Sequence, residues 1–235
     1  DINGARFIIR DKTLKFSCPD HFNDPFEFYD ELVEFDITKS YFKKIIEKRT
    51  EDRNRIKVHM KIFEADKSDF IAELIQQFKR RKDSTKVSCF SNINQNILMW
   101  SHYAQNHTGV CIEFNEEILK RTFRGDSVIE PVRYRRKIRS LNFSKYQEKA
   151  IFHWILTKSK DWEYEKEKRI ILGSDPVEFQ LFPADAILKV TFGCRTGNED
   201  LQEIVEIIKT KKLDWIQLSQ MRMDKKSYRL IESYL

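Results

Sequence analysis

Charged side chains recur at every second position in residues 161–172, just before the apolar run at 170–172. They are Glu163, Glu165, Glu167 and Arg169. Because successive side chains of a β-strand point to opposite faces, a strand here would place all of them on one face. Such a row of like charge costs free energy unless it is solvated or binds something. The neighbouring Trp162 and Tyr164 favour a packed site over a solvated edge, since large aromatic rings need a surface to pack on.

A second polar group, Ser101, His102 and Tyr103, lies between two apolar segments and follows Trp100. Ser101 and His102 do not form a nucleophilic pair, because adjacent positions of a helix do not face each other. The group either lines a binding site or belongs to a structural helix, in which Trp100 and Tyr103 pack and His102 bonds a backbone group. The sequence leaves both interpretations open.

A third polar group, Asn23 and Asp24 followed by a proline, comes after a short predicted strand at residues 14–18. Asn and Asp side chains bond local backbone groups and proline fixes the next φ, so the segment predicts a turn. Phe22 and Phe26 flank this turn and would anchor it to a core. A structural turn and a functional loop are both consistent with this pattern.

The cysteines are widely spaced, and the sequence contains no Cys-x-x-Cys pair. They are Cys18, Cys89, Cys111 and Cys194. We therefore expect reduced thiols in a cytoplasmic protein. Combinations such as Cys18 with His21 match no established zinc spacing, so we expect no metal site.

With 235 residues, 34% charged and 40% apolar side chains, the chain can bury a core, and we expect a single domain over residues 1–235. No apolar run approaches the roughly 20 residues of a membrane span, and no membrane association is expected. The net charge of +6 permits phosphate-rich partners. Of the two basic segments, 79–82 and 133–139, the second is the better candidate for nucleic-acid binding, because its basic side chains are interleaved with Tyr134. Residues 79–82 are expected to be a silent, solvated helix end.

Apolar spacing predicts helices within residues 38–82, which interrupt two strand-bearing regions and are interpreted as a helical insertion. Further strands are predicted at 85–91, 109–114, 127–134, 177–182, 186–192 and 215–218. Helices are predicted at 97–104, from Ser144 through Ile155, and from Asn198. There is no regular βαβ repetition and no Gly-rich phosphate loop, so we predict an α+β fold with a mixed, mainly antiparallel central sheet.

Taken together, the motifs resemble a known family. They are LKFSCP at 14–19, FNDPFE at 22–27, SCFS at 88–91, MWSHY at 99–103, HTGVCIEF at 107–114 and, with Lys158, WEYEKEKRI at 162–170. In this order they are similar to the bacterial domain-of-unknown-function family catalogued as number 2971, over about residues 14–194. The joint occurrence is specific, whereas each motif alone would be weak.

The resemblance implies an ADP-ribosyltransferase-like fold and an NAD-consuming toxin or anti-phage defence effector. In that fold an early strand holds NAD, a middle segment lines the nicotinamide pocket and a late Glu stabilises positive charge at the ribose C1′. The matching cofactor-binding residues are Lys15, Ser17, Asn23, Asp24, Trp100, Ser101 and Arg169. The matching catalytic residues are Glu167, Glu165, Tyr103 and His102. The chain departs from the fold's usual pattern because its first strand has no Arg or His.

Under this interpretation NAD is the substrate, and the partner is a protein or nucleic-acid acceptor, together with a neutralising or regulatory protein. Two other function classes stay open. Glu165, Glu167 and Asp24 could hold Mg²⁺ in a nuclease whose basic segments track phosphates. Alternatively, the polar groups could satisfy one another inside a non-enzymatic sensor or interaction module.

We further predict that eight of the candidate residues converge on one cleft. They are Asn23, Asp24, Trp100, His102, Tyr103, Glu165, Glu167 and Arg169. Among them, Glu167 is favoured for catalysis, with Glu165 and Arg169 in positioning roles. Close carboxylates raise the pKa of one another unless a cation compensates, and Arg169, two residues further on the same face of the predicted strand, is the nearest candidate cation.

Overall fold

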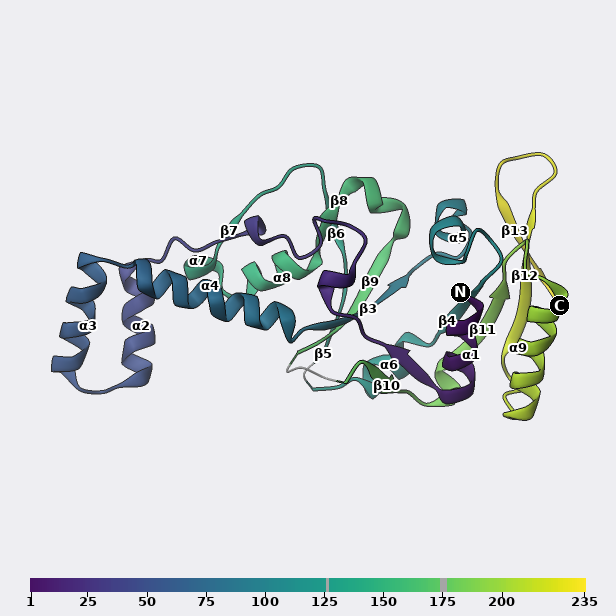
Figure 1. Ribbon diagram of the computed structural model, residues 1–235, viewed down its shortest axis with the longest axis horizontal. Helices are drawn as coiled ribbons and strands as arrows, with labels where there is room; N and C mark the ends of the chain where they lie inside the picture. The colour runs from purple at the N-terminus through teal and green to yellow at the C-terminus, as the bar shows by residue number, and fades with distance from the viewer. Residues whose placement is uncertain (126, 174–176) are drawn as a thin grey trace.

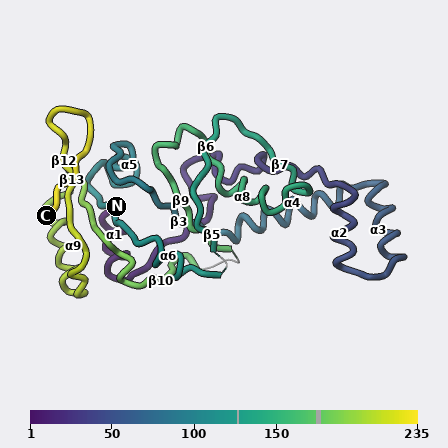
Figure 2. The backbone as a smooth tube through the Cα atoms, turned by 180° about the vertical axis from the view of Figure 1, so that it is seen from behind, coloured from purple at the N-terminus to yellow at the C-terminus, as the bar shows by residue number. Residues whose placement is uncertain are grey.

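The computed structural model describes residues 1–125, 127–173 and 177–235, and it confirms the α+β class (Figure 1). Within these residues the strands form two principal sheets rather than one central sheet, together with short two-stranded pairs. The two sheets lie side by side along the long axis of the molecule, and the helical insertion extends from one end (Figures 1 and 2).

The larger sheet has the strand order β13-β12-β11-β4. Its strands are β4 (Val110–Phe114), β11 (Ile187–Phe192), β12 (Gln217–Met223) and β13 (Leu230–Tyr234). β11 pairs parallel to β12 and antiparallel to β4, so the sheet is mixed. Helices α1 (Ile2–Asp11) and α9 (Asn198–Thr210) pack beside each other and share its core, with Ile9 and Ile204 both 0% exposed.

The second sheet is antiparallel, with order β3-β9-β5. Its strands are β3 (Lys86–Ser91), β5 (Ser127–Pro131) and β9 (Glu167–Leu172). The central strand β9 alternates between two cores. Ile170 faces the core shared with the larger sheet, whereas Ile171 faces a second core formed with α8 (Glu148–Leu156) and the end of α4. Glu167 and Arg169 therefore point to the side of the second core.

The helical insertion consists of α2 (Lys39–Arg49), α3 (Arg53–Ala65) and α4 (Ser68–Asp83), in the range where the sequence predicts helices. Thr38 caps α2 by accepting a hydrogen bond from the Tyr41 amide at 3.2 Å. The outer part of the insertion has its own small core, in which the rings of Phe42 and Phe63 stack with centroids 4.2 Å apart. The far end of α4 packs Phe78 against Trp154 of α8, which joins the insertion to the body.

The remaining elements are short. The helices are α5 (Ile97–Tyr103), α6 (Glu116–Thr122) and α7 (Phe143–Tyr146). The 3-10 turns are η1 (Pro19–His21), η2 (Asp30–Leu32), η3 (Lys160–Glu165) and η4 (Ala184–Ala186). The strands are β1 (Thr13–Lys15) with β10 (Phe179–Leu181), β2 (Val33–Glu34) with β7 (Leu141–Asn142), and β6 (Arg133–Arg135) with β8 (Thr157–Ser159).

Two local predictions are corrected by the structure. The helix expected to open at Ser144 is instead capped by Asn142, and it breaks at Gln147, whose φ of 42° separates α7 from α8. The predicted strand carrying all four charges of residues 163–169 begins only at Glu167. Glu163 and Glu165 lie in η3, which ends at Lys166 in a left-handed conformation with φ 47°.

Candidate functional site

A network of buried charged side chains lies between the antiparallel sheet and the loop and helix layer that covers it. Its members are Glu27, Lys158, Glu165, Glu167 and Arg169. Arg169 is 0% exposed, and Glu27, the most exposed of them, is only 6% exposed. Charges so deeply buried are stable only when they are paired and hydrogen-bonded.

Lys158 is the centre of this network. Its Nζ lies 2.7 Å from Glu165 Oε2, 3.0 Å from Glu27 Oε1 and 3.2 Å from Glu167 Oε2. The same Nζ lies 4.9 Å from the centroid of the Trp162 ring, which adds a cation–π contact. The three carboxylates raise the pKa of Lys158 although burial opposes this, so the ammonium stays charged.

Arg169 supplies the second cation. It donates from Nε to Glu167 Oε1 at 2.6 Å and from Nη2 to Glu27 Oε2 at 2.5 Å. Its Nη1 donates to the carbonyl oxygen of Ile155 in α8 at 2.8 Å, which ties the network to the helix. The guanidinium also lies 5.8 Å from the centroid of the Phe28 ring. Three carboxylates against two cations leave the network with one net negative charge.

The local backbone explains how these residues meet. Asp24 Oδ1 accepts a hydrogen bond from the Phe26 amide at 2.9 Å, and the Asp24 carbonyl accepts one from the Glu27 amide at 3.0 Å. This Asx turn directs Glu27 inward. At the other end, the left-handed Lys166 reverses the chain between η3 and β9, so Glu165 and Glu167 both reach Lys158 from different elements.

The cations also set the protonation of the carboxyls. Burial alone would raise the pKa of Glu167, but the charge and hydrogen bond of Arg169, together with Lys158, outweigh it and lower this pKa to about 2. For Glu27, burial outweighs the same two cations, and its pKa is raised. The pKa values of Glu167 and Glu27, whose carboxyls both contact Arg169, are therefore shifted in opposite directions.

These shifts predict a pH dependence of stability. Because the pKa of Glu167 is depressed from its ordinary 4.5 to about 2, its contribution is fully present above pH 4.5 and is lost as pH falls toward 2. The loss should be about 3 kcal/mol in the free energy of unfolding. Urea unfolding between pH 2 and 6 measures this loss. In the Glu167→Gln variant, the free energy of unfolding should depend less steeply on pH over this range. An equal slope in the variant would show that Glu167 does not carry the dependence.

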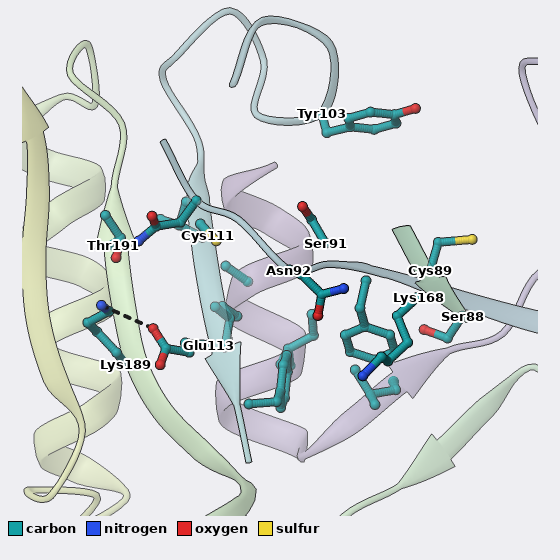
Figure 3. A pocket seen from close by; sticks show the side chains of 18 of the residues that line it. Ser88, Cys89, Ser91, Asn92, Tyr103, Cys111, Glu113, Lys168, Lys189 and Thr191 are labelled. Atoms are coloured by element: carbon teal, nitrogen blue, oxygen red, sulfur yellow. Dashed lines mark ion pairs between the residues drawn. The ribbon is translucent and has the colours of Figure 1, made fainter. Parts of the chain in front are cut away.

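A cavity of about 820 Å³ opens between the two principal sheets, against the edge strand β3. Figure 3 shows Ser88, Cys89, Ser91 and Asn92 along β3 and its continuation, Lys189 with Glu113 on the opposite wall, and Tyr103 at one end. Apolar side chains such as Val110 and Ile112 of β4 and Ile170 of β9 line much of the rest. The cavity has a size typical of small-ligand sites, which span about 300–1,000 Å³.

Tyr103 connects the cavity to the charged network. Its hydroxyl donates to Glu165 Oε1 at 2.5 Å while its ring lines the cavity. Burial and the adjacent Glu165 carboxylate raise the pKa of Tyr103, although a hydrogen bond with Asn23 opposes this, so the phenol remains a donor. Cys89 lines the cavity beside the network. Protein atoms packed around the sulfur and the Glu167 carboxylate raise the pKa of the Cys89 thiol, so the thiol stays protonated.

Other predicted residues divide between the cavity and the surrounding structure. Lys15 lines the cavity, and its ion pair with Glu178 at 3.0 Å leaves the Lys15 side chain 58% exposed. Ser17 bridges to Val87 through its backbone, and Asp24 is buried beneath its turn. No atom of the described residues hydrogen-bonds the buried Asp24 Oδ2.

The helix α5 places its remaining candidates away from the cavity. Trp100 is 3% exposed in a separate small core, where its Nε1 donates to the Asn94 carbonyl at 2.6 Å. Ser101 is half-buried, and its carbonyl accepts from the backbone. His102 is exposed, with its ring 6.4 Å from that of Tyr164. The structure thus brings together Tyr103, Asn23 and the acidic residues, but Trp100 and His102 point elsewhere.

Sequence reasoning missed Glu27 and Lys158 as members of the site, and also Tyr134, whose hydroxyl accepts from the Glu167 amide at 2.8 Å. One available signal was charge balance, because Glu165, Glu167 and Arg169 alone leave a carboxylate without a cation. Within the described ranges, no group of His, Cys, Asp and Glu side chains is arranged to hold a metal ion. No helix among the described residues has the length and apolarity needed to cross a membrane.

Comparison with known proteins finds one protein family that matches a segment of the chain, and this segment contains part of the site. Residues 99–170, less than half of the chain, match the family model described as a protein of unknown function, DUF2971. The matched segment contains Tyr103, Lys158, Glu165, Glu167 and Arg169, and so every network member except Glu27. No curated protein and no solved structure matches the chain significantly. The chain therefore resembles this family over the segment that carries most of the charged network.

Proposed function

We propose that the cavity between the sheets binds NAD and that the protein cleaves its nicotinamide–ribose bond, as an ADP-ribosyltransferase or NAD glycohydrolase. One observation carries the proposal: Tyr103, in the wall of a cavity of about 820 Å³, donates its hydroxyl proton to Glu165 of a buried, net negative network. An ADP-ribosyltransferase-like relationship of the fold is part of the same proposal.

The chemistry requires stabilisation of positive charge. When the bond between nicotinamide and ribose breaks, its electron pair leaves with neutral nicotinamide, and positive charge develops on the ribose. A phenol that donates to a carboxylate becomes more electron-rich at its oxygen, and the Tyr103 oxygen can then face the cationic sugar. Water or an acceptor then bonds to the ribose carbon and releases a proton to solvent. This gives Tyr103 contact with substrate and Glu165 a positioning role through it.

The cavity also offers binding groups for a dinucleotide. Val110, Ile112 and Ile170 supply apolar surface for rings, and lysines at the walls can meet phosphate oxygens. Lys15 is the most available of these because its pairing with Glu178 is a surface ion pair, and such pairs contribute only about 0–1 kcal/mol. Exchange of Glu178 for a phosphate therefore costs little.

A second candidate function is a non-enzymatic binding module. It is favoured by the completeness of the network, in which Glu27, Glu165 and Glu167 all contact Lys158 and none reaches the cavity directly. The magnesium-dependent nuclease has less support, because it needs carboxylates that are available to a metal. Cytoplasmic location and action as a toxin or defence effector, together with a macromolecular acceptor, remain parts of the NAD proposal.

The direct test is incubation of the purified protein with NAD, with nicotinamide release followed by chromatography and melting temperature followed with and without NAD. We expect release of nicotinamide, and a rise in melting temperature with NAD because a ligand that binds only the native state stabilises it. A rise without cleavage in the presence of candidate protein and nucleic-acid acceptors would favour the binding module. Neither effect at millimolar NAD would refute the proposal.

A further inference from the structure

A second cavity, of about 220 Å³, lies at the strand pair β6–β8. It is lined by Thr157, Lys158 and Ser159 of β8, by the segment 135–138, and by the aromatic residues Phe26 and Tyr29. Lys158 thus lines this cavity and also belongs to the charged network, which reaches the larger cavity through Tyr103. The two cavities share none of their lining residues.

Strand alternation explains why the wall formed by the segment 135–138 is basic. Tyr134 points inward and bonds the Glu167 amide, so its neighbours Arg133 and Arg135 point to the opposite face of β6. Arg135, Arg136 and Lys137 all line the cavity and are all exposed. Within residues 1–125, 127–173 and 177–235, these three side chains form no ion pair with the protein. Their charges are therefore available to an external anion.

The same cavity has an aromatic, partly exposed wall. Phe26 is 48% exposed, and its ring packs edge-on to Tyr29 with centroids 5.5 Å apart. The buried Asp24 turn fixes the backbone at Phe26, because Asp24 Oδ1 accepts the Phe26 amide. A rigidly held, half-exposed ring in the same cavity as unpaired guanidinium groups offers one surface for stacking and another for phosphate.

We propose that this cavity binds single-stranded nucleic acid, with a base against Phe26 and the adjoining phosphates on Arg135, Arg136 and Lys137. The volume is below the roughly 300 Å³ at which whole-ligand pockets begin, so it fits one base of a strand that continues over the surface. An acidic peptide would meet the same cations, but it would leave the aromatic wall without a planar partner. Binding here is independent of NAD cleavage.

The experiment measures fluorescence anisotropy of a labelled 12-nucleotide single strand of mixed sequence with the full chain at several salt concentrations. The charge variant is Arg136→Gln with Lys137→Gln, and the stacking variant is Phe26→Leu, which keeps apolar packing but removes the ring. We expect each variant to weaken binding roughly tenfold. The charge variant should also lower the slope of log affinity against log salt by about 0.7 for each lost phosphate contact.

A matched control removes the same charge elsewhere: Arg80→Gln with Arg81→Gln, at the exposed end of α4. This control should bind like the original protein, and melting temperatures should verify that all variants are folded. Unlabelled polyphosphate is the competitor that contains phosphate without bases. Equal binding by the charge or stacking variant would overturn the proposal. So would an equal loss in the α4 control, or competition by polyphosphate as strong as that by the unlabelled oligonucleotide.

Discussion

Replacing Arg169 by Met lowers the free energy of unfolding by about 3–5 kcal/mol, because it leaves buried carboxylates without one of their two cations. Arg169 is 0% exposed and bonds Glu27, Glu167 and the Ile155 carbonyl, so water cannot replace it without opening the core. For a domain of this size the loss corresponds to a fall in melting temperature of roughly 10 °C or more.

The matched control for Arg169→Met is Lys168→Met, one residue away on the opposite face of β9. Lys168 bonds Glu116 at 2.7 Å with its own side chain 23% exposed, so its removal should cost at most about 1 kcal/mol. Adding Glu167→Gln to Arg169→Met should restore part of the lost stability, since the uncompensated charge is then removed. If Arg169→Met and Lys168→Met lower the melting temperature by the same amount, the network does not stabilise the fold.

Local periodicity predicted much of the secondary structure. Helix α9 was expected from its apolar spacing, with Ile204 and Ile208 in the core, and the insertion helices from the same kind of pattern. Helix α1 was not predicted, although its buried residues Ile2, Ala5 and Ile9 have helical spacing. The division into two sheets depends on long-range pairing, such as β4 with β11 and β3 with β9, which no local pattern encodes.

The candidate site could be predicted only in part, because local spacing in the sequence indicates only some of its residues. The sequence indicated that Glu165, Glu167 and Arg169 belong together, but it assigned Glu165 to a strand. The alternation is interrupted by Lys166, whose left-handed φ of 47° is uncommon for a lysine. Lys158 and Glu27 meet only through tertiary packing of β8 and the Asp24 turn. Glu167, favoured from its position in the sequence for catalysis, is held by Arg169, whereas Glu165 is the carboxylate that bonds Tyr103 at the cavity wall.

If the NAD proposal is correct, Glu165→Gln and Tyr103→Phe each lower the rate of nicotinamide release roughly a hundredfold or more, with little change in melting temperature. Glu165→Gln removes the charge that polarises the phenol, and Tyr103→Phe removes the oxygen that faces the sugar. Lys158 keeps Glu27 and Glu167 as partners in both variants, so the buried ammonium stays compensated.

Because the two residues act as one unit, the double variant should be scarcely slower than either single variant. The matched control is Glu163→Gln, two residues from Glu165 in the same 3-10 turn, where the carboxylate pairs with Lys160 at the surface. It should cleave NAD at the original rate, and in cells it should keep whatever toxicity the original protein has. Steady-state rates at saturating NAD distinguish the outcomes. Full activity in both Glu165→Gln and Tyr103→Phe would mean that the hydrogen bond between these residues is structural and that cleavage takes place elsewhere.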